Sequence, residues 1–436
     1  MKKITILFSI FLIINFSSTI KTANSQQNLP GGLLGGLLGV LGNVIDSLRN
    51  LLTPKFNLND EELKDLAEKL GELAKLGYTI TQEELQKRVQ QVFEINTLTG
   101  GEWTAKLNLV SLLPLEAQKR LCGTLGVEAN GNNDGPPRNK RGSLRAKRAD
   151  SCSYKIDFDV RNRWPRCRSI ISYVQDQGQC GSCWAVSTAS CYTDRRCIER
   201  AKRRLRTPNN ARNTFSAYDL VSCSKEDGCN GGVTNEVWRW IQKNGICTGT
   251  DHPRNGGCKP YPFAPTNKDP IPESCSESCT KTLWRPTYPT DRKHNGTYIS
   301  RRSGGRITSY NALTSVGAVV GEAAIKNQLH TYGPVVACFI VYEDFDSYND
   351  GVYRVTKNYL FTKLFSIQRV SNNSLGGHAV VITGYGTATC SGTIIPFWII
   401  RNSWSPKWGK GGFFYMRRGT NECEIEKYIS YGVPKI

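Results

Sequence analysis

The chain has 436 residues, and 57 Lys and Arg against 37 Asp and Glu give it a formal net charge of +20. That length exceeds what one hydrophobic core usually fills, so we expect more than one folded unit. Its sixteen cysteines indicate an oxidising compartment rather than the cytosol. No sequence motif for nucleic-acid binding accompanies the positive charge, so we expect no nucleic-acid partner.

A short apolar run, Ile4–Phe16, follows Lys2 and Lys3 and gives way to small polar residues up to Ser25. A basic start, an apolar middle and an Ala-x-Ser site are typical of a secretory signal, so we assign 1–25 to a signal peptide. A buried helix is the alternative interpretation, and the run is too short to span a bilayer. No later segment is long and apolar enough, so we expect no membrane span and a secreted or lysosomal protein.

Residues 26–148 are interpreted as a pro-region. The Gly- and Leu-rich stretch 30–38 lacks firm periodicity and is expected to be flexible. Leucines fall on one helical face over Leu58–Leu73, and a capping box at Thr81 starts a second apolar pattern. These signals predict two amphipathic helices over 59–94, although such helices alone are ordinary helical surface.

A linker at 129–148 ends the pro-region. It begins without apolar side chains and continues into the basic runs Arg138–Arg141 and Arg145–Arg148. In an exposed linker these paired basic residues would be processing sites, and a merely soluble linker is the alternative. The sequence does not decide whether Arg141 or Arg148 precedes the mature N-terminus.

From residue 149 to residue 436 the composition changes, and cysteines, tryptophans, glycines and short β-rich runs become frequent. Helical patterns dominate before about 245 and strands after about 330, which predicts an α+β fold with a helical half and a sheet half. The predicted strands are Val335–Tyr342, His378–Tyr385, Phe397–Ile400 and Phe413–Met416.

One loop carries the features of an activated thiol. Gln177–Trp184 runs into a segment with few helix breakers, which places Cys183 in the first turn of a predicted helix. A helix N-terminus and a neighbouring imidazolium both lower a thiol pKa. The alternatives for Cys180-x-x-Cys183 are a redox pair and half of a zinc site. Neither a βαβ context nor a second Cys/His pair with the required spacing follows, so we expect no metal and no cofactor.

The partner of the thiol is chosen among four histidines. His378 begins a predicted strand after two glycines, whereas the others lie in turns or at a helix end, so His378 is preferred. An imidazole needs an acceptor on its other nitrogen, and Asn402 supplies an amide oxygen, with Trp404 expected to keep water away. Gln177 and the backbone N–H of Cys183 are the expected oxyanion donors.

Several further motifs carry a family resemblance: they are Trp164–Cys167, Cys180–Trp184, Cys229–Gly232, Gly257–Tyr261, Gly351–Tyr353, Gly376–His378 and Trp408–Gly409. Through them the chain resembles the papain family of cysteine proteases, and within it the cathepsin B group, over nearly all of 150–436. Upstream, Trp103–Ala105 and Leu121–Thr124 resemble the cathepsin B propeptide, which lies across the cleft and blocks it. The resemblance implies a papain-like peptidase domain over 149–436, with a helical lobe, a β-barrel-like lobe and the active-site cleft between them.

The resemblance also implies roles and partners. Cys183 would be the nucleophile, His378 the acid and base, Asn402 the orienting residue and Gln177 an oxyanion donor. Substrate-binding residues would be Gly231, Gly232, Gly377, Trp404 and Tyr428. Implied disulfides are Cys167–Cys197, Cys180–Cys229, Cys223–Cys275 and Cys258–Cys279, while the pairing of Cys152, Cys191, Cys247, Cys338, Cys390 and Cys423 stays open. Implied partners are protein and peptide substrates, the chain's own propeptide as inhibitor, and cystatin-type inhibitors.

Departures from the cathepsin B pattern change the expected activity. The segment Cys258–Cys279 lacks the two adjacent histidines that hold a substrate C-terminal carboxylate in cathepsin B. We therefore predict an endopeptidase with weak or no dipeptidyl carboxypeptidase activity. Tyr428 stands where cathepsin B has an acid in its second specificity pocket, which predicts a preference for apolar or aromatic residues over arginine. Residues 356–375 look like an insertion, interpreted as surface decoration rather than part of the leaving-group side.

Two surface features and one alternative function complete the predictions. Asn295 and Asn372 head N-glycosylation sequons, which agree with secretion but are common by chance. The basic cluster at 195–212 would suit a polyanion, although a solvated helix end is the preferred interpretation. The alternative function is a catalytically silent papain-like binding or matrix protein, disfavoured because the nucleophile and its partners are all present.

Overall fold

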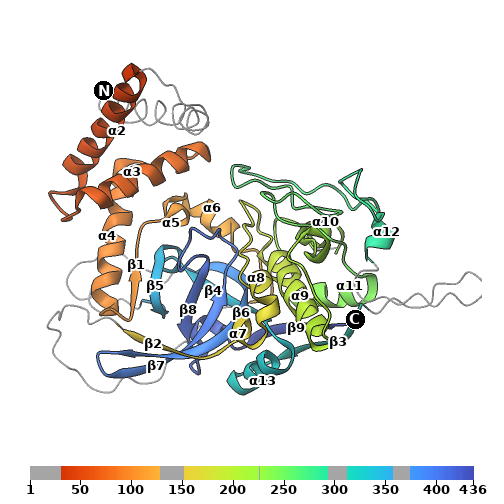
Figure 1. Cartoon of the computed structure of the whole chain (residues 1–436). Coiled ribbons are helices and arrows are strands. Elements are labelled where there is room, and N and C mark those ends of the chain that lie inside the picture. The colour runs from red at the N-terminus through yellow and green to blue at the C-terminus, as the bar shows by residue number, and fades with distance from the viewer. Residues whose placement is uncertain (1–30, 128–151, 225, 293–311, 357–373) are drawn as a thin grey trace, which may run out of the picture.

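The computed structural model describes residues 31–127, 152–224, 226–292, 312–356 and 374–436 (Figure 1). The predicted signal peptide, the basic linker, both sequons and nearly all of the predicted insertion lie outside these described residues. Within the described part of the chain, no helix is long and apolar enough to cross a membrane.

The pro-region consists of helices and one short strand. Its elements are α2 (Gly31–Leu52), α3 (Asp60–Lys75), α4 (Gln82–Thr99), β1 (Trp103–Ala105), α5 (Leu109–Leu112) and α6 (Leu115–Arg120). The two predicted amphipathic helices correspond to α3 and α4. The prediction of a flexible stretch at 30–38 is wrong for residues 31–38, which form the beginning of α2, while Pro30 lies outside the described residues.

Capping residues fix where the pro-region helices begin. The Asn59 side chain accepts from the backbone N–H of Glu62, and the Glu62 carboxylate accepts from that of Asn59, so a complete capping box starts α3. At α4 the Thr81 hydroxyl accepts from the N–H of Glu84, which is one of the two bonds of the predicted box. Each cap satisfies N–H groups that have no partner inside the helix.

A sheet carries the remaining strands. They are β2 (Ser153–Asp159), β3 (Leu313–Val319), β4 (Val335–Tyr342), β5 (Tyr348–Tyr353), β6 (Ser374–Cys390), β7 (Thr393–Arg401), β8 (Phe413–Arg417) and β9 (Tyr428–Pro434). Among the described strands the order is β1-β5-β8-β7-β6-β4-β9-β3, with β2 paired to β6. The four predicted strands match β4, β6, β7 and β8, whereas β1, β2, β3, β5 and β9 were not predicted.

The pro-region strand β1 is the edge strand of this sheet. It pairs antiparallel with β5, with Trp103 opposite Gly351. Trp103 is fully buried, and its ring lies against the rings of Tyr348 and Tyr353. The pro-region is therefore built into the hydrophobic core of the C-terminal part rather than only resting on its surface.

Helices cover the other half of the molecule. They are α7 (Val160–Arg163), α8 (Arg168–Ile171), α9 (Cys183–Lys202), α10 (Ala217–Cys223), α11 (Thr234–Asn244), α12 (Tyr288–Asp291) and α13 (Glu322–Tyr332). The long helix α9 is buried from its first residue to Ile198 and packs against β6 and β9 on one side and α10 and α11 on the other. The helix α9 therefore lies between the helical half and the sheet half (Figure 1).

Five disulfides brace the domain. The four pairs implied by the resemblance are formed, and Cys152–Cys390 adds a fifth that fastens β2 to the end of β6. The cysteines outside these bonds in the described residues are Cys122, Cys183, Cys191, Cys247, Cys338 and Cys423.

The prediction of an exposed basic cluster at 195–212 is wrong for its first two arginines. Arg195 and Arg196 are buried, because they lie on the part of α9 that packs inside the domain. The guanidinium of Arg195 donates to the carbonyl oxygens of Pro334 and Gly432, so it holds backbone rather than facing solvent. Only the residues after the buried part of α9 are available to a partner.

Candidate active site

Cys183 is the first residue of α9 and is fully buried beneath the pro-region. The preceding loop is shaped by Gly178, which has a positive φ of 60°, and by the Cys180–Cys229 disulfide. That bond removes Cys180 as a second thiol and anchors the loop to the segment that carries Gly231 and Gly232. The nucleophile candidate is thus held between a rigid loop and a helix N-terminus.

The electrostatic surroundings of Cys183 favour its thiolate. Burial alone would raise the pKa of the thiol, but the charge and hydrogen bond of His378 oppose burial, and a hydrogen bond from Thr124 adds to them. The net result is that the pKa of Cys183 lies below its ordinary value of 9.0. The sulfur and the imidazole, far apart in sequence, therefore meet in one site.

Asn402 orients the imidazole of His378. His378 Nε2 lies 2.7 Å from Asn402 Oδ1, and the N–H of Ser403 donates to the same oxygen at 2.8 Å. The Asn402 atom that accepts from the Ser403 N–H is the amide oxygen, and an amide oxygen can only accept. His378 Nε2 therefore carries the proton of this bond. The Trp404 ring lies 4.7 Å from the imidazole between centroids, so it screens the bond from water.

Gln177 is positioned by a residue that the sequence analysis missed. Ser403 Oγ donates to Gln177 Oε1 at 2.7 Å, which turns the amide Nε2 toward the cleft. That Nε2 donates at 3.0 Å to the carbonyl oxygen of Leu121 in the pro-region. A backbone carbonyl of the pro-region therefore takes up the donor expected for an oxyanion. The only sequence signal for Ser403 is its place directly after Asn402.

The pro-region segment 121–127 crosses the cleft beside Cys183, where Thr124 forms isolated β-bridges with Gly232 and Gly377. The N–H of Thr124 donates to Gly377 O at 2.9 Å, and the N–H of Leu125 donates to Gly232 O at 3.0 Å. Thr124 Oγ1 lies 3.2 Å from Cys183 Sγ. Thr124 therefore covers the thiol, a role that the sequence analysis did not assign to it.

The glycines flanking the cleft have no room for a side chain. A Cβ at Gly377 would lie 2.4 Å from Thr124 O, and one at Gly231 would lie 2.9 Å from the Leu125 side chain. At Gly232 a Cβ would meet the Trp184 ring at 2.5 Å. At Gly377 the absent side chain lets the pro-region backbone approach the wall directly, whereas at Gly231 and Gly232 it makes room for the Leu125 side chain and the Trp184 ring.

Comparison with known proteins gives the family of the chain. Residues 155–433 match the model of the family described as "Papain family cysteine protease". The chain belongs to the papain family. It is therefore a cysteine protease by family, and the prediction of that family is confirmed.

Individual relatives narrow the likeness. The protease is 37% identical over 295 residues to "Cathepsin B-like cysteine proteinase 4" of Caenorhabditis elegans, an alignment that covers 64% of this chain and 75% of the relative. It is 36% identical over 292 residues to the "Cathepsin B-like cysteine proteinase" of Schistosoma japonicum, covering 64% of this chain and 72% of the relative.

A solved structure gives the same likeness at the level of the fold. "proCathepsin B S9 from Trypanosoma congolense" has a TM-score of 0.55 at 28% identity and covers 80% of this chain and 98% of that one. The α+β, two-lobed papain-like fold is confirmed.

Strand register places Tyr428, the residue predicted to line a second specificity pocket. Cys338 on β4 lies directly opposite Ala379 on β6 and Tyr428 on β9, so the three side chains share one face of the sheet. Pro-region residue Val127 and Tyr428 both pack against the hydrophobic cluster that contains Cys183, Cys338 and Ala379. Burial raises the pKa of Cys338 to about 12, so this thiol behaves as a small apolar side chain.

The segment Cys258–Cys279 of the protease contacts the pro-region. Asp269 forms an ion pair of 3.0 Å with Arg120, and Lys268 donates to the carbonyl oxygen of Gly77.

Near this segment Cys247, Cys258 and Asp291 bring ligand-type atoms within 4.8 Å of one another. Because Cys258 is bonded to Cys279, it offers no thiolate, and the group does not have the donor set of a zinc site.

Proposed function

We propose that the chain is a cysteine endopeptidase made as a zymogen, with Cys183, His378 and Asn402 as the catalytic groups and 26–148 as its inhibitory pro-region. The observation that supports this most is the thiol of lowered pKa beside an amide-oriented imidazole, covered by Thr124 of the pro-region. Proteolytic removal of the pro-region at the basic linker would free the cleft.

In the proposed reaction the Cys183 thiolate attacks the scissile carbonyl and forms the C–S bond. Gln177 Nε2 and the backbone N–H of Cys183 donate to the resulting oxyanion. The His378 imidazolium gives its proton to the leaving amine as the C–N bond breaks. Neutral His378 then takes a proton from water, whose oxygen attacks the thioester and releases the acid and the thiolate.

The segment Cys258–Cys279 supports internal cleavage. It holds no histidine, and its described contacts in the zymogen include Lys268 and Asp269 against the pro-region. A carboxylate at the substrate C-terminus thus finds no histidine pair to receive it. Incubation of the activated enzyme with peptides that have free and amidated C-termini tests this point. Efficient removal of dipeptides from the free C-terminus alone would refute it.

The pocket formed by Cys338, Ala379 and Tyr428 supports a preference for apolar or aromatic side chains at the second residue before the scissile bond. None of the three is an Asp or Glu, so a guanidinium placed there has no carboxylate counter-ion among them. A positional peptide library reads this preference directly. Dominance of arginine at that position would show that another residue supplies the acid.

Location and partners follow from the same proposal. The signal-like start supports a secreted or lysosomal protease that meets protein and peptide substrates and cystatin-type inhibitors. The alternative, a catalytically silent binding protein, predicts that the Cys183 thiol does not react. Activated protein is therefore treated with iodoacetamide at mildly acidic pH and mapped by mass spectrometry. Labelling of Cys183 together with peptide hydrolysis supports the enzyme, and an unlabelled Cys183 without hydrolysis supports the silent binding protein.

A further inference from the structure

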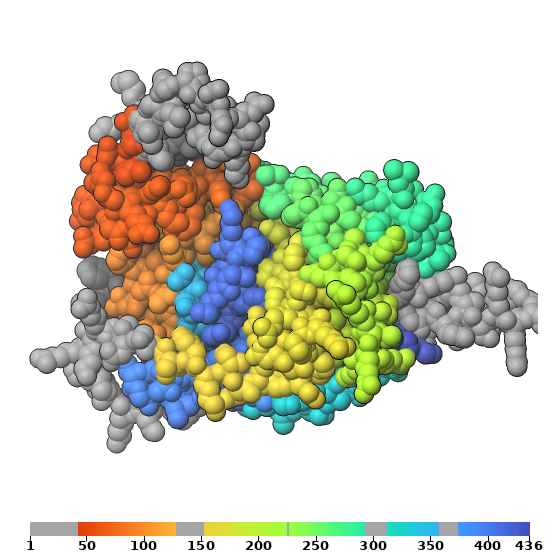
Figure 2. Space-filling view, viewed as in Figure 1, coloured from red at the N-terminus to blue at the C-terminus, as the bar shows by residue number. Residues whose placement is uncertain are grey.

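Two basic segments of the sequence meet on one surface of the protein. Residues 160–171 and 200–213 contain several Arg and Lys but no Asp or Glu. The Cys167–Cys197 disulfide joins the first segment to α9, and Asn209 Nδ2 donates to Ser169 O at 2.9 Å. α8 and α9 lie side by side, and the yellow and yellow-green surfaces adjoin on the face seen in Figure 2.

The guanidinium groups of this surface are mostly not neutralised. In the described residues the two segments form ion pairs only through Arg161, with Asp159, and Lys202, with Glu199, while Arg203 donates to Ile436 O at the C-terminus. The remaining arginines are exposed, except for the half-buried Arg200, and none is in an ion pair with a described carboxylate. They form what we call the arginine surface: Arg163, Arg166, Arg168, Arg200, Arg204, Arg206 and Arg212.

Part of the arginine surface is held in place by neutral acceptors. Arg200 donates to Thr207 Oγ1 and to Arg206 O, each at 3.0 Å. Arg168 Nη2 donates to Asn162 Oδ1 at 2.8 Å. These bonds order the side chains without cancelling their charge, so less rotamer entropy is lost when an anion binds.

The arginine surface lies far from the thiol. α9 has 20 residues, with Cys183 at its first position and Lys202 at its last. At 1.5 Å per residue its two ends are about 30 Å apart. The Cys167–Cys197 disulfide ties the other arginines to the last turns of α9, at the end away from Cys183, so a partner on this surface leaves the cleft open.

We propose that the arginine surface binds sulfated polysaccharide chains. A planar guanidinium matches the oxygens of a sulfate in paired hydrogen bonds, and a run of such groups suits a polymer with repeated anions. Sulfate and guanidinium both keep their charge across the acidic and neutral range, so the interaction persists in a lysosomal or extracellular setting. The inference depends on charge and exposure and not on the proposed proteolysis.

Binding to immobilised heparin, measured by surface plasmon resonance with the full chain, tests the proposal. The double variant Arg204→Gln/Arg206→Gln should bind at least about tenfold more weakly, and wild-type affinity should fall steeply as salt rises. The matched control is Arg239→Gln/Lys243→Gln, which removes the same charge from the exposed side of α11. It should bind within about twofold of wild type.

Three outcomes would overturn the proposal. Equal losses in both double variants would mean that net charge alone drives binding. Equal affinity for hyaluronan, which carries carboxylates only, would remove the role of sulfate. Stronger binding to vesicles containing phosphatidylserine than to heparin would assign the surface to membranes. Peptide hydrolysis by the activated arginine variant should stay at the wild-type rate, because no residue of the cleft is altered.

Discussion

At the scale of single residues, burial and the neighbouring His378 have opposing effects on the pKa of the Cys183 thiol. Burial disfavours the Cys183 thiolate, whereas His378 favours it strongly enough to bring the pKa below 9.0. The neighbouring Cys338 has the same burial without an imidazole, and its pKa rises to about 12. Position next to His378, and not residue type, therefore separates a thiol of lowered pKa from one of raised pKa.

The first prediction concerns the pH dependence of alkylation. Since the pKa of Cys183 is depressed, its thiolate is present above that lowered value and is lost as pH falls through it. In His378→Ala, burial remains without its counter-charge, so the midpoint of iodoacetamide reactivity in the activated enzyme should move to higher pH. Cys338 should stay unlabelled below pH 9 in both proteins. An unchanged midpoint in the variant would contradict the assigned role of His378.

The second prediction concerns the orienting amide. Asn402→Ala removes the acceptor of the His378 Nε2–H bond, so the ring loses its fixed orientation. We expect kcat for a peptide substrate to fall on the order of 10²-fold with little change in KM. Asn244→Ala, on the surface of α11, is the control and should leave both constants near wild type. A KM effect without a kcat effect would mean that Asn402 binds substrate instead.

At the scale of elements, one strand of the proposed inhibitory pro-region enters the sheet. β1 contributes few residues, yet it pairs with β5 and buries Trp103 completely. From there the chain continues through α5 and α6 into the segment that covers Cys183. β1 therefore anchors the segment that covers Cys183, although β1 itself lies away from the cleft.

The third prediction removes this anchor. Trp103→Ala deletes a buried aromatic side chain and should destabilise the docked pro-region by about 3–5 kcal/mol. The zymogen should then show faster labelling of Cys183 by iodoacetamide under conditions where wild type is protected. Phe93→Ala, a half-exposed ring on α4, is the control and should keep its protection. Full protection in Trp103→Ala would show that the blocking segment holds without β1.

Sequence patterns predicted some elements better than others for physical reasons. The strand Val335–Tyr342 was predicted with its observed bounds because it is a continuous apolar run buried on both faces. β2 was missed because most of Ser153–Asp159 is exposed and carries charged side chains. α2 was missed because glycines interrupt its leucines, and glycine is a poor helix former. Within the site, Thr124 and Ser403 were missed because only tertiary structure brings them to the thiol and to Gln177.

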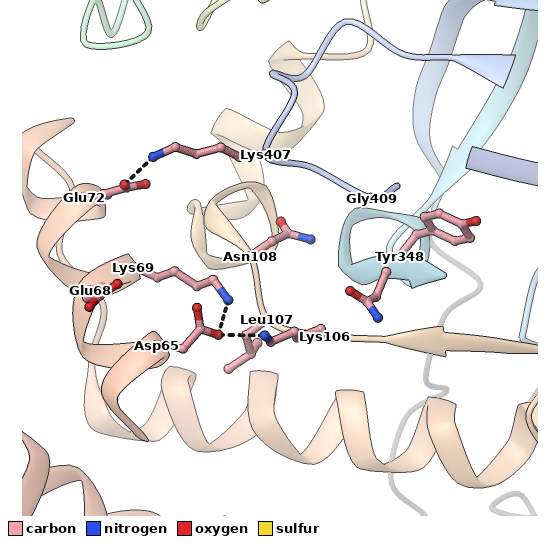
Figure 3. Close-up of a pocket in the computed structure, with 11 residues that line it drawn as sticks. Asp65, Glu68, Lys69, Glu72, Lys106, Leu107, Asn108, Tyr348, Lys407 and Gly409 are labelled. Carbon is pink, nitrogen blue, oxygen red and sulfur yellow. Dashed lines mark hydrogen bonds and ion pairs between the residues drawn. The ribbon is translucent and has the colours of Figure 1, made fainter. Parts of the chain in front are cut away.

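At the scale of the whole molecule, ion pairs join the pro-region to itself and to the protease domain. A cavity of about 320 Å³ lies where α3 faces the segment before α5 and the loop after β7 (Figure 3). Asp65 lies between Lys69 and Lys106, at 2.6 and 3.0 Å, and Glu72 pairs with Lys407 of the protease domain at 2.6 Å. Each of these ion pairs needs an ionised carboxylate, so protonation of the carboxylates at low pH weakens all of them.

The fourth prediction follows from Asp65. Burial would raise the pKa of this carboxyl, but hydrogen bonds and charges from Lys69 and Lys106 lower it below its ordinary value of 3.8. A depressed pKa means that the stabilisation is present above 3.8 and is lost as pH falls below it. In the Cys183→Ala zymogen, which cannot process itself, Asp65→Asn should lower Tm at pH 7 and flatten the decline of Tm toward pH 3. Glu68→Gln, nearby on α3, should keep the wild-type profile.

The pairing of β1 with β5 has a consequence for the mature enzyme. When the pro-region departs, the outer N–H and C=O groups of β5 lose their partners, and a free sheet edge appears. An open edge of this kind can recruit another extended chain, including the same edge of a second molecule. The pro-region would then act as a chaperone-like cover during storage as well as an inhibitor, and activation would expose a self-association surface on the side of the sheet away from β3.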